Sequence, residues 1–301
     1  MLPSDLPRSG DEDSNGPAPD DDSGVEVIVV AYGAPELLDA CLNALAGQFP
    51  VVVVDNASDP KVRAITEGRG ASYVDPGSNL GFAAGVNRGL LHRQRADADL
   101  LLLNPDAVIS SEGVRALHRC LHQRSDLACV APRQTDPFSS APSRVGWPFP
   151  TPAGAWLEAA GLSGLRRKED FMIGSVLLVR ASALAQVGGF DERFFLYAEE
   201  TDWQRRAFDG GWRMACCDEV TATHIGAGTG GSTDRRRVHF HASQERYIRK
   251  HHGRFGWEVY RAGTMAGAFI RAIVLPGQRG GEAAHRFHLY RQGPCLVESR
   301  T

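Results

Sequence analysis

The regular alternation of short apolar runs with helical patterns is the feature that most limits how this 301-residue chain can fold. Val27–Ala31 and Val51–Val54 are β-branched runs, which are typical of strands buried on both faces of a parallel sheet. Between them, Pro35–Ala46 spaces its leucines at helical intervals, starts with proline and is followed by glycine. Strand, helix and strand within about 30 residues make a βαβ unit, whose crossover is right-handed by strong default.

The alternation continues along the chain. The further elements expected in the first half are a helix at Lys61–Glu67, a strand at Ser72–Val74, a helix at Phe82–His92, a strand at Leu100–Leu103, a helix at Glu112–His122 and a strand at Leu127–Ala131. Those expected in the second half are a strand at Ser175–Val179, a helix at Ala181–Val187, a helix at Glu200–Phe208 and a strand at Trp212–Ala215. Thr135–Gly164 is rich in proline, serine and glycine and shows no clear element, and such a stretch is usually functional or mobile. The order of elements predicts a doubly wound α/β fold.

Charge divides the chain into three predicted parts, although the formal net charge is only −3. Residues 1–24 hold seven acids against one arginine and have little to bury, so we expect a disordered acidic tail. Residues 25–232 hold 19 basic and 24 acidic side chains and form the expected α/β domain. Residues 233–301 hold 13 basic and 5 acidic side chains, which predicts a basic helical C-terminal segment. Within it, Tyr260–Leu275 is typical of a helix that either lies on a membrane surface or packs on the domain.

Several classes of protein are excluded by what the sequence lacks. No apolar run reaches the ~18–20 residues of a membrane span, and the N-terminus has no secretory signal pattern. The six cysteines show neither CxxC pairs nor zinc spacing, which favours reduced thiols in a cytoplasmic protein. The turn after the first strand has no GxGxxG and the chain has no GxxxxGKS or GxxxxGKT, which excludes dinucleotide-binding and P-loop chemistry.

Polar side chains follow two of the expected strands, at the sheet edge where α/β folds bind ligands. Asp55 and Asn56 close one strand, and the Asp55 carboxylate suits either the ring NH of a pyrimidine base or a simple Asx turn. Asn104–Pro105–Asp106 closes another. Asp106 suits a divalent cation, because Mg²⁺ and Mn²⁺ favour oxygen ligands, although this tripeptide is also a common turn.

Two further segments carry chemistry at expected helix starts. Asn79–Gly89 is rich in small residues, which let either a phosphate approach free backbone NH groups or a helix pack closely on the sheet. Glu199–Asp202 places three acids in four residues. Such a group suits a general base that takes a proton from an attacking hydroxyl, or it merely complements the helix dipole.

Taken together, these segments resemble glycosyltransferase family 2, which has a GT-A fold, and more narrowly its rhamnosyltransferase-like branch. The resemblance covers roughly residues 25–250. The motifs that carry it follow one another in this order: Val53–Ser58, Asn79–Ala83, Asn104–Asp106, Gly174–Ser175, Gly188–Glu192, Phe195–Asp202 and Gly211–Trp212.

The resemblance implies an α/β fold of GT-A type, with a doubly wound, mixed and mostly parallel sheet flanked by helices. It also implies roles for particular residues. The donor nucleotide-sugar would contact Asp55, Asn56, Asn79, Gly81, Phe82, Asn87 and Asn104. A Mg²⁺ or Mn²⁺ ion would be held by Asp106 and His224, with Asn104 replacing the first acid of the family's Asp-x-Asp motif. Glu200, where the family usually has aspartate, would be the general base, with Glu199 and Asp202 binding the acceptor.

The resemblance thus implies a metal-dependent inverting glycosyltransferase that uses a nucleoside-diphosphate sugar, with dTDP-rhamnose favoured. Its acceptor would be a hydroxyl of a cell-envelope saccharide or of a polyprenyl-diphosphate-linked sugar, and no nucleic acid is expected as a partner. The enzyme would be cytoplasmic or peripheral on the inner face of the cell membrane, which the basic C-terminal segment would contact. Two alternatives remain at this point: a non-catalytic adaptor that binds a nucleotide-sugar or lipid, and a nucleotidyltransferase.

Overall fold

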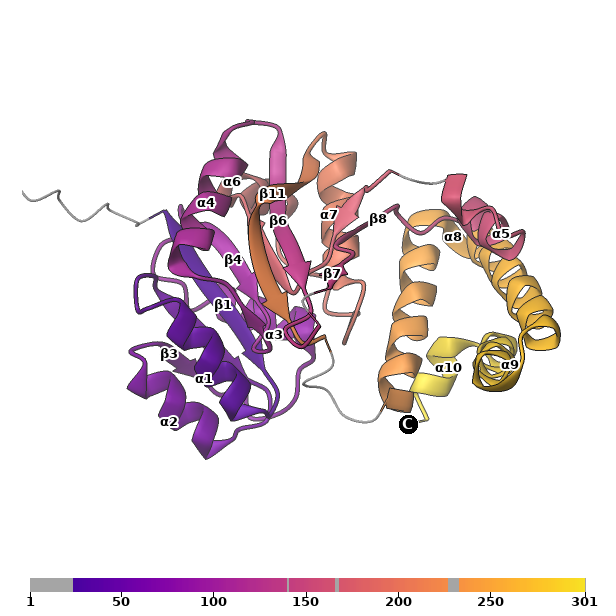
Figure 1. The fold of residues 1–301 in the computed structure, drawn as a ribbon, viewed down its shortest axis with the longest axis horizontal. Helices are drawn as coiled ribbons and strands as arrows, with labels where there is room; N and C mark the ends of the chain where they lie inside the picture. The colour runs from indigo at the N-terminus through magenta and orange to yellow at the C-terminus, as the bar shows by residue number, and fades with distance from the viewer. Residues whose placement is uncertain (1–23, 140, 166–167, 227–232, 301) are drawn as a thin grey trace, which may run out of the picture.

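A nine-stranded sheet, mostly parallel and flanked by helices, forms the centre of the larger part of the molecule (Figure 1). The structure is a computed structural model that describes residues 24–139, 141–165, 168–226 and 233–300. The predicted disordered tail therefore lies outside the described residues apart from Gly24, as does most of the Gly-rich loop that follows His224. The strand order is β3-β2-β1-β4-β10-β6-β11-β5, and β7 pairs with β6.

The strands of this sheet are β1 (Val25–Ala31), β2 (Val51–Asp55), β3 (Ser72–Val74), β4 (Asp99–Leu103), β5 (Ala107–Val108), β6 (Leu127–Thr135), β7 (Pro142–Ser143), β10 (Val176–Val179) and β11 (Arg213–His224). A separate two-stranded sheet consists of β8 (Gly146–Trp147) and β9 (Phe171–Met172). The helices beside the sheet are α1 (Pro35–Ala44), α2 (Pro60–Gly68), α3 (Phe82–Leu90), α4 (Ser111–His122), α6 (Ala181–Val187) and α7 (Glu199–Asp209). The remaining helices are α5 (Pro152–Ala159), the 3₁₀ turn η1 (Ser163–Leu165), α8 (Thr233–Val274), α9 (Gly277–Gln292) and α10 (Pro294–Glu298).

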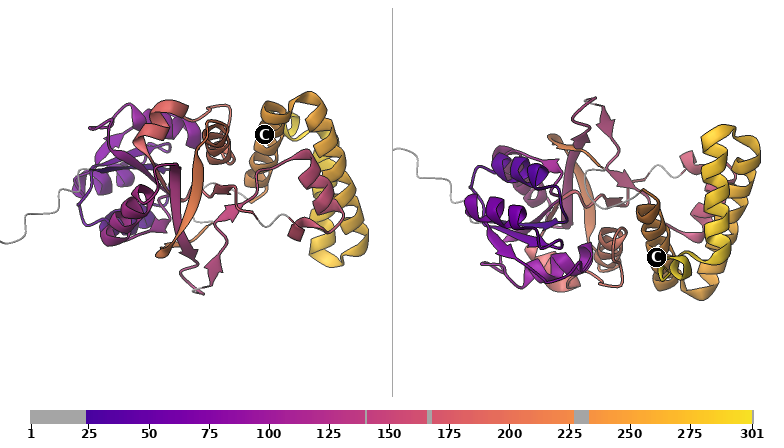
Figure 2. Two further views of the ribbon diagram at one scale, coloured as in Figure 1. Left: turned by 90° about the horizontal axis from the view of Figure 1, so that it is seen from above. Right: turned by 90° about the horizontal axis from the view of Figure 1, so that it is seen from below.

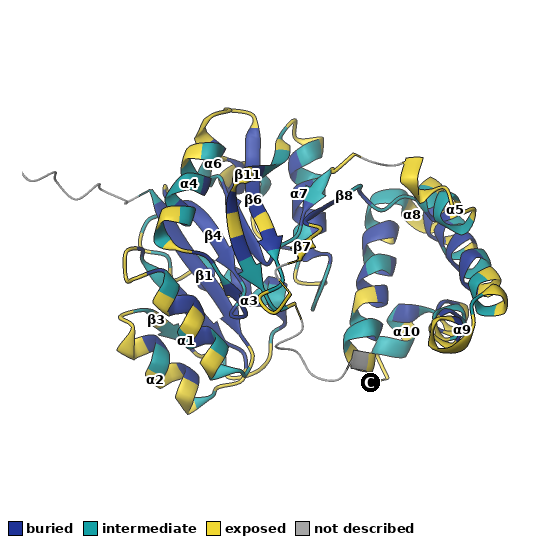
Figure 3. Ribbon diagram, in the orientation of Figure 1, coloured by how far each residue is buried: buried dark blue, intermediate teal, exposed yellow. Residues whose placement is uncertain are grey.

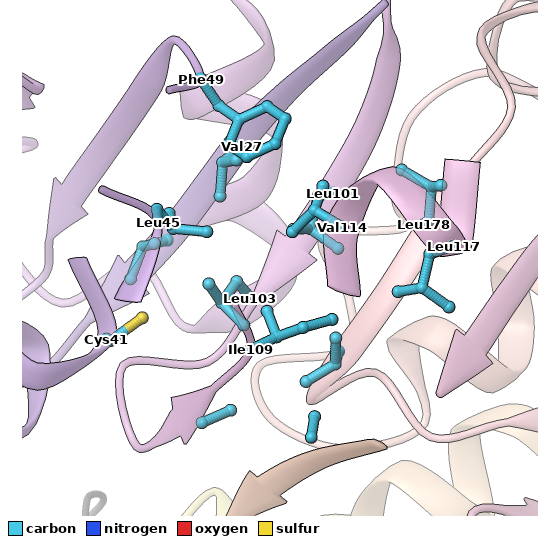
Figure 4. Close-up of a cluster of buried hydrophobic side chains, with 14 of the residues drawn as sticks. Val27, Cys41, Leu45, Phe49, Leu101, Leu103, Ile109, Val114, Leu117 and Leu178 are labelled. Atoms are coloured by element: carbon cyan, nitrogen blue, oxygen red, sulfur yellow. The ribbon is translucent and has the colours of Figure 1, made fainter. Parts of the chain in front are cut away.

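The predicted doubly wound, mixed and mostly parallel fold is confirmed, because β1, β2, β3 and β4 are all joined by parallel pairing while β10 is antiparallel to both of its neighbours. Successive residues of β1 face opposite sides of the sheet. Val27 and Val29 join a core covered by α1, α2 and α4, part of which Figure 4 shows. Ile28 and Val30 join a second core under α3, α6 and α7.

Two expectations from the sequence were wrong. Thr135–Gly164 was expected to lack regular structure, yet it contains helix α5, which begins with Pro152 after Thr151 caps it by accepting a hydrogen bond from the Gly154 NH. The strand expected at Trp212–Ala215 continues to His224 as β11. Its pairing with β6 shifts register between Cys217 and Thr221, and this bulge lets the exposed, charged Asp218 and Glu219 interrupt the apolar pattern.

The C-terminal part of the chain is helical, as predicted, and stands beside the sheet domain (Figure 2). Helix α8 is kinked at Gly253, whose φ of 69° suits glycine. Beyond the kink α8 packs against α5 and α9. A third core joins α8 to the segment before α7, since Trp257 and Tyr247 lie in the same cluster as Phe194 and Ala198. None of the helices in the described ranges is both long and apolar enough to cross a bilayer.

A close backbone contact fixes the loop between β3 and α3 and generates the first prediction. Gly81 has a φ of +80°, and a Cβ there would lie 2.3 Å from the Phe195 carbonyl oxygen. Gly77 has a similar φ of +77°, but its Cβ would meet nothing within 4 Å. We expect Gly77→Ala to cost about 1 kcal/mol, from backbone strain alone. Gly81→Ala should cost a further 1–3 kcal/mol or so, because the Phe195 segment must move.

Urea unfolding of the two variants measures this difference in the free energy of unfolding. Equal destabilisation of the two variants would contradict the close contact, because both residues have a positive φ but only Gly81 is crowded.

Candidate active site

The short strand β5 brings together two residues that are far apart in the sequence. Its antiparallel pairing sets Ala107 opposite His224 at the end of β11. The Nε2 atom of His224 consequently lies 3.3 Å from Oδ1 of Asp106, whose side chain is almost fully buried. The Asp106 carbonyl also accepts a hydrogen bond from the Ile225 NH. The two residues predicted to hold a metal ion are therefore neighbours, with a carboxylate and an imidazole facing each other.

A strained turn presents Glu199 and Glu200 at the start of α7. Tyr197 and Ala198 both adopt the left-handed backbone conformation, with φ of 69° and 65°. Two successive residues of this kind without glycine are costly, and such strain is concentrated at functional sites. Gly174 leaves room for Glu200, because a Cβ at Gly174 would lie 3.2 Å from the Cβ of Glu200. The geometry thus holds both carboxyl groups in the interior.

Burial changes the acidity of these two carboxyl groups. It raises the pKa of Glu200 to about 7. Burial, together with the adjacent Glu200, raises the pKa of Glu199 well above its ordinary value. Among the residues that the structure describes, neither Glu199 Oε2 nor Glu200 Oε2 has a hydrogen-bond partner. A carboxyl group with a pKa near neutrality and an unused oxygen has the properties of a general base.

Tyr197 joins the two halves of this site. Burial raises the pKa of its hydroxyl, and nearby charges act on it as well. The charged side chains that act on this hydroxyl are Arg236, Glu199, Asp106 and Glu200. The charges of Asp106, the metal-binding candidate, and of Glu200, the base candidate, therefore both act on the Tyr197 hydroxyl. The sequence motif contained Tyr197 without indicating a role for it, and nothing in the sequence pointed to Arg236.

The predicted donor-binding residues at the end of β2 are largely engaged with the protein itself. The fully buried Asp55 accepts hydrogen bonds from the NH groups of Ala57 and Asp59 and from the Tyr73 hydroxyl, so it closes an Asx-type turn. Asn56 donates to the Gly81 carbonyl and thereby ties the loop before α3 to the strand. Asn79, Gly81 and Asn104 lie in the same region: the Asn79 side chain accepts from the Gly81 NH, and the Asn104 NH donates to the Ser175 carbonyl where β4 meets β10.

The glycine-rich start of α3 serves packing in this structure. The Phe82 NH, expected to be free for a phosphate, donates to the Phe195 carbonyl at 2.7 Å. A Cβ on Gly85 would lie 2.7 Å from Val30, so this glycine allows the helix to sit on β1. Asn87 is engaged at both ends of its amide: it donates to the Phe190 carbonyl and to Glu192 and accepts from the Phe190 NH. Asn87 holds the loop after α6 in place.

Asp202 lies one turn into α7 and is enclosed by a lysine, an arginine and a histidine side chain. Lys250 Nζ lies 2.8 Å from Oδ2, His251 Nε2 lies 2.8 Å from Oδ1, and Arg206 Nε lies 3.0 Å from Oδ2. The carboxylate is fully buried. Burial acts to raise its pKa, but hydrogen bonds from His251 and Lys250 outweigh burial and lower it. Lys250 and His251, which belong to the basic C-terminal segment expected to contact a membrane, here anchor α8 on α7.

A second cluster of ionisable side chains lies at the opposite end of β4 from Asp106. Asp99 begins that strand, and its Oδ2 lies 2.7 Å from His122 Nε2 and 3.4 Å from His118 Nε2. Its Oδ1 accepts from the Ala181 NH. Arg180 Nη1 lies 3.4 Å from His122 Nδ1, an arrangement in which Nδ1 accepts and Nε2 carries the proton toward Asp99. These hydrogen bonds join α4 to the sheet, remote from the carboxylates of α7.

The sequence of this chain is similar to those of known proteins. Residues 22–251 match the family described as Glycosyltransferase like family 2. The low-salt glycan biosynthesis hexosyltransferase Agl10 of Haloferax volcanii is 30% identical over 212 residues, which cover 66% of each chain, so the present chain spans just under two thirds of that relative. The N-acetylglucosaminyl-diphospho-decaprenol L-rhamnosyltransferase of Mycobacterium tuberculosis is 29% identical over 230 residues, covering 66% of this chain and 75% of the relative.

A solved structure shares the fold. Glucosyl-3-phosphoglycerate synthase from Mycobacterium tuberculosis, in complex with Mn²⁺, uridine-diphosphate and glucosyl-3-phosphoglycerate, superposes with a TM-score of 0.51. Its sequence is 13% identical, and the match covers 74% of this chain and 79% of that one. At this identity the likeness extends to the arrangement of helices and strands.

The anchoring of Asp202 generates a stability prediction. Asp202→Asn should lower the free energy of unfolding by about 3 kcal/mol, since it leaves Arg206 without its buried counter-charge and leaves Lys250 with Asp191 alone. Because the folded-state pKa of Asp202 is lowered, its charge stabilises the fold above the ordinary aspartate pKa of about 4 and ceases to do so as the pH falls through the lowered value. The gap between wild type and variant should therefore be constant above about pH 5 and shrink below it.

Chemical unfolding across this pH range measures the gap. Asp209→Asn is the matched control, because its pair with Arg205 lies half exposed on the same helix and should be worth less than about 1 kcal/mol. An Asp202→Asn variant no less stable than this control would show that the buried cluster does not hold α8 on α7.

Proposed function

Because the chain belongs to the glycosyltransferase-like family 2, we propose that it is a metal-dependent inverting enzyme that transfers a sugar from a nucleoside-diphosphate donor. The favoured donor is dTDP-rhamnose, and the favoured acceptor is a hydroxyl of a saccharide carried on a polyprenyl diphosphate or of another cell-envelope glycan. The observation that carries the proposal is the Glu200 carboxyl, which has a buried Oε2 atom and a pKa of about 7, and whose charge acts on the same Tyr197 hydroxyl as that of Asp106, the neighbour of His224.

The proposed chemistry assigns the proton transfer to Glu200. The acceptor oxygen attacks the anomeric carbon from the side opposite the diphosphate, and the bond between that carbon and the diphosphate oxygen breaks. The hydroxyl proton passes to a Glu200 oxygen, for which Oε2 is available among the described contacts. Glu199 lies beside the base and, in this proposal, contacts the acceptor through its Oε2 atom, which has no hydrogen-bond partner among the described residues.

Asp106 and His224 would hold a Mg²⁺ or Mn²⁺ ion. The fit rests on their donor atoms, because a carboxylate oxygen and an imidazole nitrogen 3.3 Å apart are close enough to ligate one ion. Two protein ligands leave coordination positions for the oxygens of the donor diphosphate. When bound, such an ion stabilises the negative charge that develops on the leaving diphosphate.

Asp202 acts in this proposal as a positioning residue in place of the acceptor contact first expected. Its two oxygens are engaged with Lys250, His251 and Arg206. The residue lies three positions after the first glutamate of the pair, on the same helix. Holding Asp202 against α8 therefore fixes the start of α7, where both glutamates are displayed.

The proposed donor and acceptor take their support from the two curated relatives. The name of the Mycobacterium tuberculosis relative describes L-rhamnosyl transfer with N-acetylglucosaminyl-diphospho-decaprenol. That of the Haloferax volcanii relative describes hexosyl transfer in glycan biosynthesis. A polyprenyl-linked acceptor lies in a membrane, so we propose a cytoplasmic enzyme that works peripherally at the inner membrane face.

Glu200→Gln tests the proposed base. The variant should fold normally but lose about 10²–10⁴-fold in kcat, the usual contribution of general-base catalysis. In the wild type, kcat/KM should rise about tenfold per pH unit up to about pH 7 and then level off, because only the ionised carboxylate accepts a proton. This rise should be absent from the residual activity of the variant.

The measurement is steady-state transfer of sugar to a polyprenyl-diphosphate-linked acceptor across this pH range. Glu219→Gln is the matched control, because Glu219 is an exposed glutamate on β11 and its loss should leave both rate and pH profile unchanged. A Glu200→Gln variant with the wild-type rate and the same acid limb would contradict the assignment of the base.

Asp106→Ala tests the metal and the donor together. Wild type should be stabilised by nucleoside-diphosphate sugar plus Mn²⁺, by about 2.7 kcal/mol when the ligand is present at 100 times its Kd. The variant should fold but lose most of this stabilisation, along with turnover. Thermal shift with dTDP-rhamnose, UDP-glucose and GDP-mannose, each with and without EDTA, measures the effect and ranks the donors.

Asp218→Ala controls for the loss of an acidic side chain, because Asp218 lies exposed on β11 in a surface pair with Arg133. Metal-dependent stabilisation of Asp106→Ala equal to wild type would rule out Asp106 as a ligand. Stabilisation by another sugar nucleotide in preference to dTDP-rhamnose would reassign the donor and leave the base and metal roles standing.

A further inference from the structure

Exposed apolar side chains gather at one end of the helical C-terminal part of the molecule. At the end of α8, Ile270, Ile273 and Val274 are 50%, 69% and 69% exposed. In and just before η1, Leu162 and Leu165 are 49% and 73% exposed. We call these residues, with the 54% exposed Phe269, the apolar tip: Leu162, Leu165, Phe269, Ile270, Ile273 and Val274.

The two segments of the apolar tip lie side by side, although they are more than 100 residues apart in the sequence. A Cβ on Gly267 would lie 2.9 Å from the Cα of Ala159, so the end of α5 touches α8 just before the tip. The Arg271 side chain also donates to the Glu158 carbonyl. The tip is therefore one surface held by packed helices, and Figure 2 shows α5 against α8 at this end.

The same end of the molecule is basic. Arg271, Arg279 and Arg286 lie toward this end, while Arg261 and Arg291 are joined by a hydrogen bond at the far end of α9. The acid nearest the tip on α5, Glu158, is paired with Arg271 at 3.3 Å and with Arg286 at 3.0 Å. Arg279, in the first turn of α9, is exposed. An apolar surface with cationic side chains beside it complements a membrane that carries anionic lipids.

The rest of α8 argues against a spanning helix and for a surface contact. Its opposite face packs on α5 and α9, so the helix is held within the protein. Aliphatic side chains at the end of a docked helix reach only the outer part of a bilayer, as interfacial helices do. We propose that the apolar tip inserts into the headgroup region of an anionic membrane, with Arg279 meeting the lipid phosphates.

Vesicle flotation of the full chain tests this proposal. Wild type should bind vesicles of phosphatidylcholine with phosphatidylglycerol more tightly than vesicles of phosphatidylcholine alone. The triple variant Ile270→Ser, Ile273→Ser, Val274→Ser should bind the anionic vesicles at least about tenfold more weakly, since a tenfold change corresponds to about 1.4 kcal/mol and burial of two CH₂ groups exceeds that. Arg279→Gln should weaken binding to anionic vesicles only, and added salt should reduce this difference.

The matched control is Leu91→Ser with Phe138→Ser, which removes two exposed apolar side chains from the sheet domain, 77% and 84% exposed, and should bind vesicles like wild type. Wild type that floats with neither vesicle, or a folded triple variant that binds like wild type, overturns the proposal. So does a wild-type dimer that the triple variant converts to monomer, because the tip would then be a subunit interface. The proposal rests on the membrane position given in the proposed function. Flotation does not use the sugar-transfer reaction, so its failure would remove that membrane position and leave the proposed donor, base and metal roles intact.

Discussion

The buried carboxylate of Asp202 is the interaction on which the geometry of the candidate site depends. A fully buried charge is tolerated only when it is paired and hydrogen-bonded. Two of its partners, Lys250 and His251, come from α8, and the third, Arg206, from its own helix. The requirement to satisfy one carboxylate thus joins the C-terminal helices to the start of α7. Part of the strongly basic charge of residues 233–301 is explained by this internal use.

Helix α7 carries two acids whose pKa values are shifted in opposite directions. Glu200 is buried with one oxygen unpartnered among the described contacts, and burial raises its pKa to about 7. In Asp202, the hydrogen bonds from His251 and Lys250 outweigh burial and lower the pKa. When two environments shift the pKa values of two carboxyl groups in opposite directions, one group can act as a proton acceptor while the other stays charged as an anchor. The two side chains meet different surroundings because residues two positions apart on a helix point roughly 200° apart around its axis.

Much of the sheet domain follows from the sequence, and the failures have physical reasons. Apart from the two-residue strand β5, the strands and helices between residues 25 and 131 were predicted, because β-branched runs alternate there with amphipathic patterns. Helix α5 was missed because it is only eight residues long and its signal, a capping threonine before proline, lies within a glycine- and proline-rich stretch. A bulge and two charged residues hid the length of β11.

The roles of the site residues could be predicted from the sequence only in part. A glycine-rich helix start is the same pattern whether a ligand or a strand approaches it, and here Gly85 faces Val30. The contact between Asp106 and His224 depends on β5, a two-residue strand too short to leave a periodic signal. Likewise, the sequence presents the basic C-terminal segment as available for a membrane, since it does not show that Asp202 already engages Lys250 and His251.

The firmly docked helical extension connects the candidate site to the apolar tip. Figure 3 shows buried positions along α8 and exposed positions at its far end. Through Lys250 and His251, just before its kink at Gly253, this helix is fixed to Asp202, which positions the start of α7. Its C-terminal end carries the apolar tip. A rigid link between the two would set the height of the base above a membrane, and a lipid-linked acceptor can vary its position only within the membrane plane. Constraining that height reduces the conformational freedom that must be lost when acceptor and donor align.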